Sequence, residues 1–93
     1  MQADYDSQAN AISIWWGSRE LAEGADRVHP RAIAGLRGGE PIEVQLLYPD
    51  LGLEEPLGAV AERYDLDPGA LIAAAEAAVA MPNQVVTLRL TVP

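Results

Sequence analysis

The segment "NAISIWW", residues 10–16, alternates large apolar side chains with small or polar ones and ends in two adjacent tryptophans. This spacing of β-branched and aromatic residues predicts a β-strand. Neighbouring side chains of a strand point to opposite faces of its sheet, so Trp15 and Trp16 cannot both enter one core. We expect Ile12, Ile14 and Trp16 on the buried face and Trp15 on the other face.

Two further strands are predicted between residues 17 and 49. The segment "GSRELAEG", residues 17–24, is bounded by glycines and indicates a loop with one helical turn. A strand over residues 26–36 and another in "PIEVQLLYP", residues 41–49, then flank Gly38 and Gly39. This glycine pair tolerates the positive φ angles of a tight hairpin turn, so it predicts a hairpin.

The register of this hairpin stays open at this point. A two-residue turn would place Ile33 opposite Val44, but it would also bring Arg31 to the same face as Leu46. Because Pro30 cannot donate to a ladder, an edge position or a bulge near it would turn Arg31 outward.

After residue 49, apolar residues recur at helical spacing. The segment "EPLGAVAERY", residues 55–64, predicts a first helix. A second helix is predicted in "LDPGALIAAAEAAVAMP", residues 66–82, with Asp67 as its N-cap and Pro68 in its first turn. Strict alternation returns in "QVVTLRLTVP", residues 84–93, and predicts a last strand.

These elements predict an α+β fold in a single domain, residues 1–93. The expected sheet has four strands, is mainly antiparallel and carries the two-helix segment on one face, in the order β-β-β-α-α-β. Alanines on the second helix let it lie close to the sheet. The expected core consists of Ile12, Ile14, Trp16, Val44, Leu46, Val86, Leu88, Leu90 and, from the helices, Leu57, Val60, Leu71, Ala74, Ala75, Ala78 and Val79.

The charge balance is strongly acidic. Fourteen Asp and Glu residues against six basic residues give a net charge of −8, which repels phosphate backbones and favours basic partners. No apolar run approaches the roughly 20 residues that span a bilayer, and the acidic N-terminus is unlike a signal peptide. We therefore expect a cytoplasmic protein with no membrane contact.

The inventory of metal ligands is poor. Cysteine is absent, which removes disulfides, thiol nucleophiles and thiolate metal sites. One histidine cannot make a structural zinc site, and Asp65 with Asp67 falls short of a calcium loop. No cofactor and no metal site is predicted.

A catalytic site is equally poorly supported. Ser7, Ser13 or Ser18 could be combined with His29 and Asp26, but no Gly-x-Ser-x-Gly turn presents a nucleophile. The expectation is that the protein is not an enzyme.

Residues 57–75 resemble a helix-turn-helix unit in the spacing of their apolar positions. Two features count against DNA binding. Asp65 stands at the turn position usually held by glycine, and residues 68–81 contain no Lys, Arg, Asn or Gln to contact a base edge or a phosphate. A transcriptional regulator that uses this segment within a larger complex is the alternative function.

The stretch "YDSQANAISIWW", residues 5–16, resembles the start of a class of small bacterial proteins of unknown function. In that class the first strand carries Tyr-Asp, a short polar gap, and Ala-Asp/Asn-Ala before alternating apolar residues. The likeness extends over residues 4–48 through the "EPIEVQLLYP" strand, and it implies the fold without an activity. The matching positions are Tyr5, Asp6, Ala9, Asn10, Ala11, Ile12 and Ile14.

The leading functional hypothesis is a non-enzymatic, acidic protein–protein interaction module of a bacterium, of the antitoxin, immunity-protein or assembly-subunit kind. Trp15 on the outer face of the sheet, near Leu47 and Val85, would form an exposed contact patch. The alternative is that the loop over residues 17–24 or the N-terminal tail covers the Trp15 ring.

A second candidate contact is the alternating trio Arg27, His29 and Arg31. It could bind an anion or an acidic partner, or it could pair across strands with acids such as Glu43. The expected partner is another protein, which the negative charge predicts to be basic, and a homodimer would relieve the thin core of so short a chain.

Overall fold

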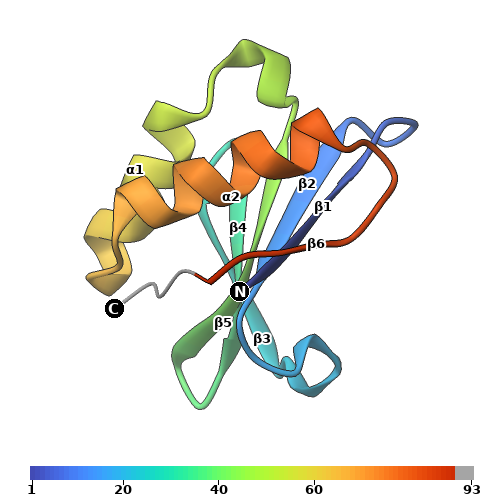
Figure 1. Ribbon diagram of the computed structural model, residues 1–93. Coiled ribbons are helices and arrows are strands. Elements are labelled where there is room, and N and C mark those ends of the chain that lie inside the picture. Colours follow the sequence, from blue (N-terminus) through green and yellow to red (C-terminus); the bar gives the residue numbers. More distant parts are fainter. Residues whose placement is uncertain (90–93) are drawn as a thin grey trace.

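Six antiparallel strands form one sheet in the computed structural model, which describes residues 1–89 (Figure 1). Two α-helices cover one face of this sheet. The strands are β1 (Gln2–Asp6), β2 (Ala11–Trp15), β3 (Gly24–His29), β4 (Ala32–Arg37), β5 (Glu40–Leu47) and β6 (Val86–Thr87). The helices are α1 (Glu54–Tyr64) and α2 (Pro68–Ala80), and two short 3-10 helices are η1 (Arg19–Leu21) and η2 (Pro49–Leu51). The strand order across the sheet is β3-β4-β5-β2-β1-β6.

The α+β class agrees with the prediction, but the predicted count of four strands is wrong. One additional strand is β1, a polar segment whose Ala3 pairs with Ile14 and whose Tyr5 pairs with Ile12. Ala3 is buried and Tyr5 is half-buried, so only two side chains of β1 mark its inner face. The other addition arises because the expected strand over 26–36 is two strands, β3 and β4, with a tight turn between them at Pro30.

One register shift lies between Arg27 and His29 in the β3–β4 pair, and a second one, in the β4–β5 pair, settles the hairpin register that the sequence leaves open. Gly38 and Gly39 have φ angles of 59° and 82° and form the expected two-residue turn, with Arg37 paired to Glu40. A shift between Gly35 and Leu36 then places Ala34, rather than Ile33, opposite Val44. The two-residue turn is therefore present without the Ile33–Val44 pairing that it would give in a regular hairpin.

The same shift removes the conflict over Arg31. Ala32, a small apolar residue, pairs with Leu46 and occupies the core position, so Arg31 does not share the face of Leu46. Gly35 is required beside this bulge, because a Cβ there would lie 2.5 Å from the Cγ of Glu43.

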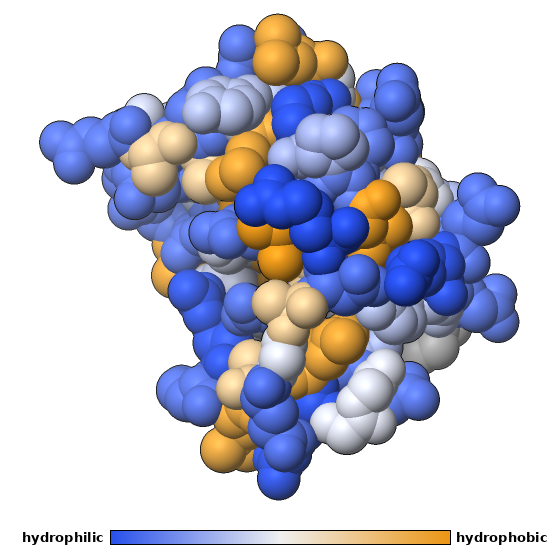
Figure 2. Space-filling model, turned by 180° about the vertical axis from the view of Figure 1, so that it is seen from behind, coloured by the Kyte–Doolittle hydropathy of each residue, from blue (hydrophilic) through white to orange (hydrophobic). Residues whose placement is uncertain are grey.

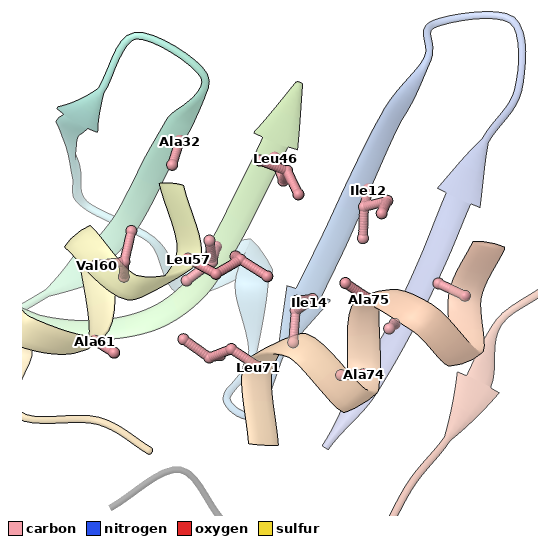
Figure 3. Close-up of a cluster of buried hydrophobic side chains, with 13 residues drawn as sticks. Ile12, Ile14, Ala32, Leu46, Leu57, Val60, Ala61, Leu71, Ala74 and Ala75 are labelled. Atoms are coloured by element: carbon pink, nitrogen blue, oxygen red, sulfur yellow. The ribbon is translucent and has the colours of Figure 1, made fainter. Parts of the chain in front are cut away.

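Both helices bury their apolar faces against the sheet. α1 packs on β3, β4 and β5, whereas α2 packs on β1 and β2 (Figure 1). Figure 3 shows the side chains of the two layers meeting, with Leu57 and Leu71 from the helices close to Ile14 and Leu46 from the sheet. The expected core is largely confirmed, and the small alanines on α2 keep its axis near the strands.

Local hydrogen bonds account for the start of α2 and for the position of one tryptophan. The Asp67 carboxylate accepts hydrogen bonds from the backbone N–H groups of Gly69 and Ala70 at 2.9 and 3.4 Å, which makes it the N-cap that the sequence predicts. Trp16 is half-buried against the core, and its Nε1 donates to the Pro41 carbonyl at 3.0 Å.

The packing expected for the end of α2 and for the last strand is confirmed in part. Val79 was expected in the core, but its side chain is 41% exposed because it lies on the side of α2 turned away from the sheet. Val86 and Leu88 pack against the core as expected, whereas Leu90 and Val92 lie outside the described residues.

Across residues 1–89, no helix combines the length and the apolar character that crossing a membrane requires.

A charged and hydrogen-bonded cluster attaches α1 to the outer strand β3. Asp26 of β3 accepts a hydrogen bond from the Tyr64 hydroxyl at 2.6 Å and forms an ion pair with Arg63, with 2.6 Å between Nε and Oδ2. The hydrogen bond to Asp26, together with burial, raises the pKa of Tyr64 above its ordinary value of 10.0. The folded chain therefore holds the phenol proton more tightly than the unfolded chain does.

This raised pKa gives a testable pH dependence. The stabilisation that it represents is fully present below about pH 10 and is lost as the pH rises through the folded-state pKa. We expect Tyr64→Phe to lower the free energy of unfolding by about 1 kcal/mol near neutral pH. The variant should also lack the part of the alkaline loss of stability that comes from the Tyr64 phenol. Urea unfolding from about pH 8 to about pH 11 measures it, with Tyr48→Phe at a 51% exposed phenol as the control. Equal alkaline slopes for wild type and Tyr64→Phe would contradict the prediction.

Candidate functional site

A groove of about 710 Å³ opens beside the C-terminal half of α2. We call it the α2 groove. It lies in the upper part of Figure 1, where η2, the end of α2 and the β1–β2 turn approach one another. Its volume falls within the range of ligand-binding clefts. The lining residues are Tyr5, Ser7, Asn10, Pro49, Asp50, Leu53, Glu76, Val79 and Ala80.

Exposed apolar residues include Val79 of the lining and three residues that are next to lining residues in the chain. Tyr48 and Leu51, at the two ends of the η2 turn, are 51% and 67% exposed. Val79 and Met81, at the end of α2, are also exposed. Because small proteins seldom leave several large apolar side chains together in water, this grouping indicates a contact surface.

Three residues with positive φ angles form the turns at the border of the groove. Asn10 and Tyr48 both have φ angles of 52°, and Gly52 has a φ angle of 116°. The Tyr48 N–H donates to the Asn10 carbonyl at 2.9 Å, which joins the β1–β2 turn to the start of η2. These turns bring two segments that are forty residues apart in the sequence to one wall of the groove.

The polar part of the lining is a chain of side-chain hydrogen bonds. The Tyr5 hydroxyl donates to Asn10 Oδ1 at 2.9 Å, and Asn10 Nδ2 donates to Asp50 Oδ1 at 2.9 Å. Asp6 shapes the same turn, since its Oδ1 accepts from the N–H groups of Gln8 and Ala9. The Tyr-Asp and Asn positions of the "YDSQAN" motif thus build the turn and one side of the groove.

Only acidic groups carry charge in this lining. Asp50 and Glu76 are both exposed, and neither forms an ion pair within residues 1–89, where the arginine–carboxylate pairs are Arg19–Glu43 and Arg63–Asp26. The lining of the groove therefore combines apolar side chains with two carboxylates that form no ion pair within residues 1–89.

Trp15 lies on the sheet face opposite the helices, as predicted, but it is only partly exposed. The Arg19 guanidinium of η1 lies 4.2 Å from the centroid of the Trp15 ring and 3.8 Å from the Glu43 carboxylate. The covering of Trp15 by the 17–24 loop, one of the two alternatives drawn from the sequence, is therefore present. Figure 2 shows this face, on which hydrophilic residues separate small hydrophobic areas.

The structure does not bring Trp15, Leu47 and Val85 together. Leu47 pairs with Ala11 and Glu43 pairs with Trp15, so Leu47 and Trp15 lie at opposite ends of β2. Val85 is 57% exposed in the segment before β6, beside a separate hollow formed with Asp4, Tyr5 and Asp6 of β1.

The basic trio is also divided. His29 Nε2 lies 3.3 Å from Glu55 of α1, and His29 Nδ1 accepts from the Arg31 N–H at 3.1 Å. The Arg31 guanidinium donates to the carbonyls of Leu47, Tyr48 and Leu51, while Arg27 donates to the Pro30 carbonyl. The Arg31 N–H bonds to His29, but the charged end of Arg27, the Nε2 atom of His29 and the Arg31 guanidinium contact three different segments, and Arg31 serves to hold the η2 turn.

The helix-turn-helix-like segment forms two helices joined by a short turn, with Asp65 in a left-handed conformation at φ 55°. The face of α2 that carries Leu71, Ala74, Ala75 and Ala78 is buried against the sheet. The opposite side, which carries Glu76, Val79 and Ala80, lines the α2 groove.

His29 is not joined to a serine within the described part of the chain, since its ring contacts Glu55 and Arg31. Residues 1–89 likewise hold no group of three or more His, Asp or Glu side chains spaced to bind a metal ion.

No protein-family model, curated protein or solved structure matches the chain. The α2 groove is not predicted from the sequence, although two signals of it are visible there. One is Val79, whose apolar side chain at helical spacing predicts a core position, and the other is the pair Tyr5 and Asn10 of the "YDSQAN" motif, which line the groove.

Proposed function

We propose that this protein is a non-enzymatic protein–protein interaction module, and that the α2 groove is its contact surface for a basic segment of another protein. The observation that carries the proposal is that one groove of about 710 Å³ is lined both by apolar side chains, among them the 41% exposed Val79, and by two carboxylates, Asp50 and Glu76, that form no ion pair within residues 1–89. An antitoxin, an immunity protein or an assembly subunit would work in this way, in the cytoplasm and without a cofactor.

The apolar and the acidic residues of the groove support the proposal in different ways. Leu53, Val79 and Ala80 offer apolar area, whose burial supplies most of the free energy of association. Asp50 and Glu76, in a chain of net charge −8, attract cationic partners and repel acidic ones. The Trp15 face is a weaker candidate, because Arg19 covers its ring.

Regulation of transcription through residues 57–75 is less well supported. The exposed side of α2 presents Glu76, Val79 and Ala80, and no residue of α2 is basic. A gel-shift titration at low salt tests this alternative, since tight and salt-sensitive DNA binding by the chain alone would favour it.

A peptide titration tests the proposed contact surface. The probe is a capped hexapeptide of alternating Lys and Leu, added to the ¹⁵N-labelled chain and followed by amide chemical shifts. We expect shifts at Leu53, Val79 and Ala80, with little change at Ser13 and Gln45 on the opposite sheet face.

Two matched variants locate the binding. Val79→Gln removes apolar surface inside the groove and should weaken binding by roughly fivefold, whereas Val85→Gln changes the same residue type at an exposed position outside the groove and should have no effect. Shifts confined to the Trp15 face, or equal effects of the two variants, would refute the α2 groove as the contact surface.

A further inference from the structure

The chain Tyr5–Asn10–Asp50 fixes the position of one carboxylate at the edge of the α2 groove. The Asn10 side chain is engaged at both ends, because its oxygen accepts from the Tyr5 hydroxyl and its nitrogen donates to Asp50 Oδ1, each at 2.9 Å. This pattern determines the orientation of the Asn10 amide. It leaves the second oxygen of Asp50 without a side-chain donor in the described residues.

The supports of this chain are built into the backbone. Asn10 is held by the hydrogen bond between its carbonyl and the Tyr48 N–H at 2.9 Å. The η2 turn that carries Asp50 is held from the other side by Arg31, whose guanidinium donates to the Tyr48 carbonyl at 2.8 Å and to the Leu51 carbonyl at 3.4 Å. Asp50 is therefore positioned before any partner arrives, which lowers the entropy cost of binding.

A segment that fills the groove also covers Asp50. Removing a carboxylate from water is costly unless a cation or a hydrogen-bond donor replaces the lost hydration. Asp50 has no cationic partner of its own within residues 1–89, so the incoming segment has to supply one. Leu53 and Val79 in the same groove require that this segment also carry apolar side chains.

We propose that Tyr5 and Asn10 position the Asp50 carboxylate as the receptor for a lysine or arginine side chain of the segment that binds in the α2 groove. This inference rests on the proposed function and adds the residue that selects the partner. Asp50 is the contact, whereas Tyr5 and Asn10 are positioning residues that act through it.

The test compares three capped hexapeptides in which Leu alternates with Lys, Gln or Glu, and it measures each Kd by the same amide-shift titration. For the wild type we expect the Lys peptide to bind roughly fivefold more tightly than the Gln peptide, and the Glu peptide to bind most weakly. Asp50→Asn should bring the Kd values of the Lys and Gln peptides together, so that the preference for Lys is lost.

Two further variants separate positioning from charge and from folding. Asn10→Gly removes the amide but accepts the φ angle of 52°, so it should reduce the ratio of the Gln-peptide Kd to the Lys-peptide Kd. Asp65→Asn removes one exposed carboxylate outside the groove, at a left-handed position that asparagine tolerates, and should change neither Kd.

Failure of this inference and failure of the proposed function give different results. Equal Kd values for the Lys and Gln peptides in the wild type, with shifts still in the groove, would overturn the role of Asp50 and leave the contact surface standing. Absence of groove shifts with all three peptides would overturn both proposals. A loss of the Lys preference in Asp65→Asn equal to that in Asp50→Asn would show a general charge effect and overturn the receptor role.

Discussion

Leu71→Ala is expected to lower the free energy of unfolding by about 2 to 5 kcal/mol. Leu71 is fully buried in the first half of α2, where it contacts the core shared by both helices and the sheet (Figure 3). The loss combines the transfer free energy of the removed carbon atoms with the cavity that they leave.

Urea unfolding followed by circular dichroism measures this loss, and Leu51→Ala is the matched control. Leu51 is 67% exposed, so the same change there should alter stability by less than about 0.5 kcal/mol. Because domains of this size have only about 5 to 15 kcal/mol of stability, Leu71→Met is a milder second variant with an expected cost below about 1.5 kcal/mol. A cost of Leu71→Ala no larger than that of Leu51→Ala would show that Leu71 is not part of the core.

Ala75→Leu is expected to destabilise the fold by about 1 to 3 kcal/mol, or more, by the opposite mechanism. Ala75 is fully buried between α2 and the strands β1 and β2, and its single methyl group allows the helix to lie close to the sheet. A leucine side chain has no space there and would push the helix outward or force strained rotamers. Alanine and leucine have similar helix propensity, so the effect reports packing alone.

Ala73→Leu on the same helix is the control for Ala75→Leu. Ala73 is half-exposed, and its substitution should change stability by no more than about 0.5 kcal/mol. Thermal and urea unfolding of both variants checks the pair. Similar stabilities for the two variants would mean that α2 does not lie close on the sheet at Ala75.

The local elements were largely predictable because their signals are carried by neighbours in the chain. Alternation over residues 10–16 identified β2 and sent Trp15 and Trp16 to opposite faces. The Asp67 cap, the glycine turn at 38–39 and the apolar spacing of the two helices were also visible. β1 was not predicted because only Ala3 and Tyr5 face inward in a polar segment. The single strand expected over 26–36 is divided by a turn at Pro30 that the prediction did not include.

Periodicity, caps and turn residues along the chain were thus enough to establish the α+β class, the helix pair on one face and most of the core. The six-strand sheet, the pairing of Ala34 with Val44 and the α2 groove were established by folding, since each depends on residues that meet from distant segments. The alternation along a strand shows which side chains point inward. It does not show which residues pair across strands, because a single bulge shifts every pairing beyond it. The exposure of Val79 and the link from Asn10 to Asp50 likewise follow from how three turns and a helix end approach one another, which no local stretch encodes.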